Sequence, residues 1–318
     1  MSRTFSLRIA FAIFAVLVVA NAAQAAYPDK PVQYIIPFAP GGESDVAARL
    51  QQQVFKNKFN QDLIVVNKAG AGGALAWSQL NSLPGDGYSI MGVNLPHIVL
   101  QPLEAGTQFK TEDITPVYFF HYTPDAIIVN VDSPFKTFAD LVKAAREKPE
   151  SVSLAGSGTN SANHLATERL NRELGIKTLY VPFKGTGDLV SSVLGNHVSG
   201  AMSYSTLAIQ QKGKMRMLAV ATEKRLPQFP EVPTFRELGF NWVDGAYRGI
   251  GVPKSTPPEI RKQVSDMMDA INKDPELRKR MADGGFEVTD ISLEQVPAFV
   301  QGRSVEYLNA AKGLGMVK

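Results

Sequence analysis

The chain has 318 residues, which is longer than most single compact domains, so two domains or lobes are expected. Its 33 basic and 30 acidic residues leave a formal charge of +3, without the strongly basic character of a nucleic-acid-binding domain. It contains no cysteine, which excludes disulfides, thiolate metal sites, iron–sulfur clusters, thiol nucleophiles and a lipid anchor on an N-terminal cysteine.

Residues 1–25 are expected to form a secretory signal peptide. Arg3 and Arg8 lie in a short polar start, residues 9–20 are an unbroken apolar run, and residues 23–25 (AQA) have the small-x-small cleavage pattern. The alternative is a membrane anchor, but this run is shorter than the roughly 20 residues that a bilayer core requires. We therefore expect cleavage after residue 25 and a soluble mature protein free in the periplasm.

The first part of the mature chain alternates between expected strands and helices. Three apolar runs have strand length: residues 32–36, 63–66 and 88–93. A helix capped by Gly42 or Ser44 is expected after the first run, and the glycine-rich run 69–73 is expected to open a helix that continues through Leu80. This β-α-β-α-β order indicates a mostly parallel sheet with helices on its faces.

The order changes near Tyr122. Two strand-like runs, 117–122 and 126–130, are separated by residues 123–125 (TPD), and a second α/β series follows. Its strands are expected at 152–155, 178–181, 197–202, 217–221 and 249–252. Its helices are expected to begin at Thr137, at Asn160 or Ser161, after Gly187, at 257–258, at 274–275 and at Leu293.

This layout predicts two α/β lobes joined by two chain crossings, near residues 122–126 and 243–249. Lobe 1 is expected to comprise residues 26–123 and 245–318, and lobe 2 residues 124–244. Ligands of open α/β sheets bind at the carboxyl ends of strands, so loops of both lobes should line one cleft.

Signatures of catalysis are missing from the sequence. There is no G-x-S-x-G, no H-E-x-x-H, no P-loop and no complete G-x-G-x-x-G, and the four histidines lack metal-ligand spacing. The sequence therefore predicts no catalytic residue, no metal and no cofactor. A hydrolase using Ser157 and His164 is the enzyme alternative, which is disfavoured because no nucleophile elbow surrounds Ser157.

Five small polar or glycine-rich loops lie at strand ends before expected helices: residues 37–45, 69–73, 94–97, 156–161 and 184–187. Glycine lets the backbone approach a ligand, and a helix N-terminus offers free N–H groups that suit a carboxylate. Each loop alone could be an ordinary tight turn with a helix cap. Together they favour a shared anion site.

The opening YPDKPVQYIIPFAPGGESDVAARL resembles that of the solute-binding receptors of tripartite tricarboxylate transporters, the Bug family. Further matches include NKAGAGGA, PGDGYSIMG, YVPFKGTG, FPEVPTFRELG and VPKSTPP. The resemblance implies a periplasmic binding protein fold, type II-like, in which two lobes joined by a two-crossing hinge capture a small carboxylate. It also implies integral membrane permease subunits as partners. A monomer is expected.

The expected ligand-binding residues come from these loops and from the second crossing. The resemblance assigns the loop residues by position, and Tyr204 is expected either to wall the pocket or to pack in the core. The full set is Phe38, Pro40, Gly41, Gly42, Ser44, Asp45, Asn94, Ser157, Thr159, Asn160, His164, Lys184, Gly185, Thr186, Ser203, Tyr204 and Arg248.

Three positions carry a sharper hypothesis. Arg248 can hold a carboxylate with two parallel hydrogen bonds, or it can form a structural ion pair across the hinge. Family members often have an acidic residue where Ser203 stands, and its loss makes an amino-acid ligand less expected. Glu43 replaces a small residue and either points to solvent or narrows the pocket.

We therefore expect a periplasmic receptor for a small organic acid. The preferred ligand is a di- or tricarboxylate, followed by aromatic carboxylates, and it is delivered to a membrane secondary transporter. The alternative is a ligand-sensing receptor that presents its ligand to a signalling partner, because fold and site would be the same.

Overall fold

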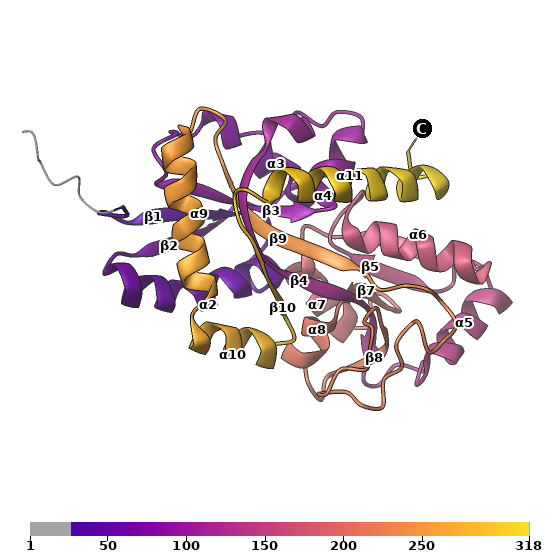
Figure 1. The fold of residues 1–318 in the computed structure, drawn as a ribbon. Coiled ribbons are helices and arrows are strands. Elements are labelled where there is room, and N and C mark those ends of the chain that lie inside the picture. Colours follow the sequence, from indigo (N-terminus) through magenta and orange to yellow (C-terminus); the bar gives the residue numbers. More distant parts are fainter. Residues whose placement is uncertain (1–26, 318) are drawn as a thin grey trace, which may run out of the picture.

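The computed structural model describes residues 27–317, so the expected signal peptide lies outside the described part. Two joined sheets form the centre of the molecule, and helices cover them (Figure 1). None of the helices within residues 27–317 combines the length and the hydropathy that a membrane crossing requires.

The first sheet contains the three expected N-terminal strands. They are β1 (Val32–Ile36), β2 (Leu63–Asn67) and β3 (Ser89–Leu95). Strand β1 lies between the other two and is parallel to both, as the alternating order predicts. Strand β9 (Gly245–Val252) then pairs with β3 in antiparallel orientation. The sheet is therefore mixed, with its parallel part at the N-terminal edge.

The strand at the centre of the molecule differs from the prediction. Residues 117–122 and 126–130 are not two strands but parts of one, β4 (Thr115–Asn130). Pro124 has no N–H to donate, yet it stays in register opposite Gly245, and the Asp125 N–H donates to the Asp244 carbonyl at 3.0 Å. Backbone pairing thus continues through the residues that were expected to break it.

The second sheet is built on the C-terminal half of β4. Its other strands are β7 (Gly200–Tyr204), β5 (Ser153–Gly156), β6 (Leu179–Pro182) and β8 (Met215–Val220). Strands β7 and β8 pair with β4 in antiparallel orientation, and β5 lies parallel between β7 and β6. All four were expected, with ends shifted by a few residues.

Two lobes joined by a two-crossing hinge therefore make up the fold, and β4 and the segment entering β9 are the crossings. We propose boundaries after residues 123 and 244. In support, β4 pairs with β9 up to Pro124 and with β7 from Asp125 onward, and β9 begins at Gly245.

Ten α-helices are described within residues 27–317, and most have the expected starts. Their bounds are α2 (Glu43–Phe59), α3 (Ala74–Trp77), α4 (His97–Leu100), α5 (Phe138–Glu147), α6 (Ala162–Leu174), α7 (Thr186–Leu194), α8 (Ser205–Gln210), α9 (Pro258–Asn272), α10 (Pro275–Asp283) and α11 (Val296–Gly313). Thr137 caps α5 and Ser161 caps α6 through side-chain oxygens that accept backbone N–H groups, and Gly42 is the cap of α2.

The glycine-rich run 69–73 does not open a helix that continues through Leu80, so this prediction was wrong. A 3₁₀ turn at Ala71–Gly73 leads into the single turn of α3, and a second 3₁₀ turn follows at Leu80–Ser82. Gly72 and Gly73 have φ values of 60° and 106°, which interrupt a right-handed helix. Helix α4 begins at the end of the loop 94–97, where a helix was expected, whereas helix α8 and strand β10 (Glu287–Ile291) were not expected.

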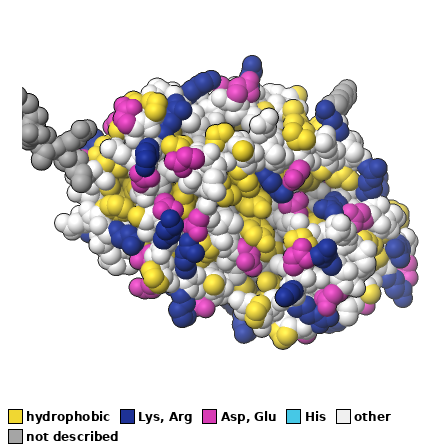
Figure 2. Space-filling view, viewed as in Figure 1, with side chains coloured by type: hydrophobic (Ala, Val, Ile, Leu, Met, Phe, Trp, Pro, Cys, Tyr) yellow, Lys and Arg dark blue, Asp and Glu magenta, His cyan; other side chains and the backbone are white. Residues whose placement is uncertain are grey.

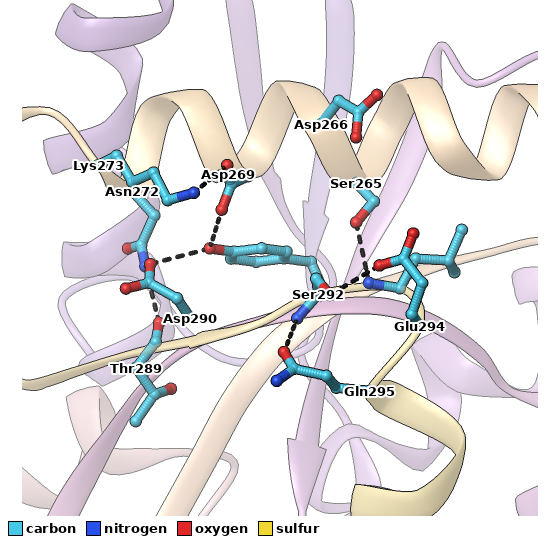
Figure 3. A network of polar contacts seen from close by, with 12 residues as sticks. Ser265, Asp266, Asp269, Asn272, Lys273, Thr289, Asp290, Ser292, Glu294 and Gln295 are labelled. Atoms are coloured by element: carbon cyan, nitrogen blue, oxygen red, sulfur yellow. Dashed lines mark hydrogen bonds and ion pairs between the residues drawn. The ribbon is translucent and has the colours of Figure 1, made fainter.

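A polar network ties the C-terminal elements to β4 (Figure 3). The Tyr118 hydroxyl of β4 contacts a carboxylate oxygen of Asp269 in α9 at 3.1 Å and one of Asp290 in β10 at 3.0 Å. Asn272 donates to Asp290 at 2.7 Å, and Arg278 of α10 pairs with it. Burial alone would raise the pKa of Asp290, but these hydrogen bonds hold the pKa below its ordinary value.

Tyr118→Phe is expected to lower the free energy of unfolding by about 1–3 kcal/mol, because it removes the one hydroxyl hydrogen that two partly buried carboxylates share. Urea denaturation measures the change. Tyr122→Phe is the matched control, in the same strand but outside the network. Equal losses in the two variants would contradict a stabilising role of this hydroxyl.

Candidate functional site

The candidate site is a small cavity between the two lobes. It has a volume of about 10 Å³, so the described conformation is closed around space for about one water molecule. Loops after β1 and β3 line one side, loops after β5 and β6 and the end of β7 line the other, and β9 contributes from the hinge. The lining residues are Phe38, Glu43, Ser44, Asn94, His97, Ser157, Thr186, Tyr204 and Arg248.

Glycines allow the two lobes to approach so closely. A Cβ on Gly42, at the start of α2, would lie 2.8 Å from the Thr186 hydroxyl oxygen. A Cβ on Gly187 would lie 2.2 Å from the Pro40 carbonyl oxygen, which is far inside van der Waals contact. The loop after β1 and the loop after β6 therefore dock through bare backbone, and any side chain at either glycine would hold the lobes apart.

Polar contacts join the lobes around the cavity. The Glu43 N–H donates to the Thr186 hydroxyl at 3.1 Å, and the Glu43 carboxylate accepts from the Thr206 hydroxyl. Further out, the Thr159 hydroxyl lies 2.9 Å and 3.0 Å from the two carboxylate oxygens of Glu104. These contacts hold the closed conformation together.

Arg248 is the cation of the cavity and is only 3% exposed. Its Nη1 donates to the Thr123 hydroxyl and, at 3.0 Å, to the Ala246 carbonyl, and the guanidinium lies 4.6 Å from the centre of the Tyr204 ring. Nε is buried without a partner. Among residues 27–317 Arg248 forms no ion pair, so Nε remains as a donor for a ligand while Nη1 is anchored on both crossings.

Several other polar atoms of the cavity are buried without a partner. They are Glu43 Oε2, Asn94 Oδ1 and His97 Nδ1. Burial and Arg248 lower the pKa of His97 to about 3, so its ring is neutral near pH 7. Buried polar groups without partners are rare in folded proteins, and their concentration here indicates a place that a polar ligand completes.

Of the predicted site residues, Phe38, Ser44, Asn94, Ser157, Thr186, Tyr204 and Arg248 line the cavity. Others shape its loops: Asp45 accepts from the Gly41 N–H at 2.9 Å, and the Asn160 N–H donates to His164 Nδ1 at 3.1 Å. Ser203 is fully buried but does not line the cavity. Pro40, Gly42 and Gly185 belong to the docking loops and are also not among its lining residues.

Thr159 and Lys184 lie in a different, wider pocket of about 400 Å³, which Gly72 and Asp188 also line. A third cavity of about 200 Å³ is lined by residues of α6 and α11 together with Asp125 and Asp244 of the crossings, and it contains none of the predicted site residues. The small interlobe cavity is therefore the one that the sequence-predicted residues share.

Two lining residues were missed as site residues. His97 belongs to the loop 94–97, which was predicted to lie at the cleft. It was nevertheless interpreted as structural, because the histidines lack metal-ligand spacing. Glu43 was considered only as a residue that points to solvent or narrows the pocket. The structure shows it 3% exposed and facing the cavity, which it narrows.

Two lobes that close through a two-crossing hinge over a polar cavity define a solute-binding protein of the periplasmic type. The chain belongs to the family described as tripartite tricarboxylate transporter family receptor, whose model matches residues 47–314. This is a family of solute-binding receptors and not of enzymes.

Solved structures with the same fold include the periplasmic binding protein BugD, which is 29% identical with a TM-score of 0.85 and is matched over 92% of this chain and 100% of its own. A Rhodopseudomonas palustris protein with adipate is 25% identical, with a TM-score of 0.85 and coverage of 91% and 98%. MatC from the same organism, with bound malate, is 25% identical, with a TM-score of 0.80 and coverage of 89% and 99%.

Proposed function

We propose that this protein captures a small organic acid in the interlobe cavity and delivers it to the membrane components of a tripartite transporter. The observation that carries the proposal is Arg248, a buried guanidinium that lines the cavity between the two lobes and whose Nε is buried without a partner. A ligand carboxylate would accept from this nitrogen in a charge-assisted hydrogen bond. The hydroxyls of Ser44, Ser157 and Thr186 are further donors on the cavity wall.

The family and the ligands of related structures support an acid as the ligand. Di- and tricarboxylates are the first candidates, and aromatic carboxylates are the next. Because the described cavity holds only about 10 Å³, a ligand must enter an open form, and the lobes then close on it by hinge motion. The closed form is the one that the permease recognises in this proposal, and the leader at residues 1–25 would place the mature protein in the periplasm.

Ligand binding is expected to raise the melting temperature of the purified protein. A ligand that binds only the folded state adds RT ln(1 + [L]/Kd), about 2.7 kcal/mol at 100 times Kd. A thermal-shift screen over dicarboxylates, tricarboxylates, aromatic acids, amino acids and sugars tests this. If sugars or cations stabilise the protein and no acid does, the protein is not an organic-acid receptor.

A further inference from the structure

Glu43 places a carboxyl group in the cavity, opposite in charge to Arg248 when it is ionised. It is the first residue of α2, and its side chain spans from one lobe toward the other, where Thr206 donates to Oε1. The residue is 3% exposed, and Oε2 is buried without a hydrogen-bond partner. Burying an ionised carboxylate oxygen in this way lowers the stability of the folded protein unless a hydrogen-bond donor reaches the oxygen.

Among residues 27–317, no group donates a hydrogen bond to Glu43 Oε2. Burial raises the pKa of Glu43, while Arg248 and the hydroxyls of Thr206 and Thr123 oppose the rise. Arg248 acts on Glu43 through space and does not form an ion pair with it among the described residues. With His97 neutral, the charges of Glu43 and Arg248 cancel, and the cavity carries no net charge when Glu43 is ionised.

The unpartnered atoms of the cavity define what a ligand must bring. Arg248 Nε needs an acceptor, whereas Asn94 Oδ1 needs a donor. Burial raises the pKa of Glu43, so Oε2 needs a donor in the ionised form, and a ligand cation favours that form. A plain dicarboxylate at neutral pH offers acceptors only, so it would satisfy Arg248 and place its own negative charge near Glu43. A molecule with one carboxylate and one protonated amine satisfies both kinds of atom and matches a cavity of zero net charge.

We propose, on the basis of the carboxylate-capture function above, that Glu43 selects ligands that carry a protonated amino group beside the carboxylate. Within the organic acids of the proposed function, this selection places the amino acids ahead of the plain di- and tricarboxylates, which are the first candidates on the family alone. The expectation against amino acids came from Ser203, which has no carboxylate, but Ser203 does not line the cavity. Glu43 supplies the missing carboxylate from the facing lobe.

Matched pairs of acids test this by calorimetric titration. L-aspartate, L-leucine and L-phenylalanine are each compared with the same acid lacking the amino group, which covers acidic, aliphatic and aromatic side chains. In every pair that binds, the amino member is expected to bind about tenfold or more tightly, because a charge-assisted hydrogen bond distinguishes the two. Equal or tighter binding of the acid without the amino group overturns the proposal.

Glu43→Gln keeps the shape of the side chain and removes its charge, so it should reduce the preference for the amino member to about threefold or less. Glu104→Gln is the matched control, because Glu104 also bridges the lobes, through Thr159, but lies outside the cavity. Its preference should equal that of the wild type. An unchanged preference in Glu43→Gln overturns the role of Glu43. Tighter binding of both the amino acid and the acid without the amino group also overturns it, because Glu43 would then occupy the position of the ligand carboxylate.

Failure of the underlying function looks different. If neither these pairs nor the di-, tri- and aromatic carboxylates bind to the wild type, the organic-acid receptor itself is wrong and Glu43 has nothing to select. If plain acids bind and the amino acids do not, the receptor function stands and the selection by Glu43 is wrong.

Discussion

Arg248→Ala is expected to weaken binding of the acid by about 10- to 150-fold. A hydrogen bond to a charged group contributes roughly 1.5–3 kcal/mol net, and each 1.4 kcal/mol is a factor of ten in affinity. The loss should lie at the upper end of this range, because Arg248 is 3% exposed and its unpartnered Nε has no water-facing alternative. Calorimetric titration with the tightest acid from the thermal screen measures it.

Arg248→Lys is expected to recover only part of the affinity. An ammonium group cannot anchor itself on Thr123 and Ala246 and at the same time present a second donor in a fixed plane. Arg169→Ala is the control, since Arg169 also lies over an aromatic ring, that of Trp242, but outside the interlobe cavity. Unchanged affinity together with a lower melting temperature in Arg248→Ala would make this residue a structural part of the hinge.

Acidification from pH 7 to pH 5 is expected to destabilise the ligand-free protein through its buried histidines. Burial and Arg248 lower the pKa of His97 to about 3 and that of His121 well below its ordinary value. In the unfolded chain both titrate near pH 6.5. Below that pH the unfolded state binds more protons than the folded state, so the free energy of unfolding falls. For His97 this costs on the order of 2 kcal/mol at pH 5, and His121 acts in the same direction.

His121→Leu isolates this effect. Both ring nitrogens of His121 are buried without partners, and the ring packs against Phe120 and Phe286, so an apolar side chain of similar volume fits the surroundings. Urea denaturation at both pH values should show a smaller loss of stability between pH 7 and pH 5 than in the wild type. The comparison between variants is needed because Glu43 and Asp125, whose pKa values burial raises, act in the opposite direction.

His197→Gln is the matched control, because His197 is exposed. It should leave the pH dependence of stability unchanged. A wild-type pH dependence in His121→Leu would show that His121 is protonated in the folded protein.

The sequence predicted the site best where local chemistry alone decides the structure. Consecutive glycines between an apolar strand and an amphipathic helix allow few structures other than a tight loop at a helix start, and Gly41 and Gly42 form that loop. Arg248 was located because a crossing between lobes must pass the cleft, and β9 carries it there.

The errors lie where distant residues decide. Pro124 breaks a strand by local rules, but Gly245 opposite it leaves room for the close approach, and the pairing continues through the Asp125 N–H. Strand β10 (EVTDI) has no apolar run, and it exists because β4 offers it an edge. The direction of Glu43 depends on Thr206, 163 positions away in the chain, and no local pattern contains that contact.

The continuity of β4 also bears on how the lobes move. A hinge of two free loops rotates almost without restoring force, whereas β4 and β9 are hydrogen-bonded to each other up to Pro124, and β4 runs on directly into the second sheet. We therefore expect opening to twist this paired ribbon while its backbone hydrogen bonds stay intact. Such a ribbon has one preferred geometry and resists deformation from it. The equilibrium between open and closed forms then depends on the few contacts across the cleft that a ligand adds or replaces.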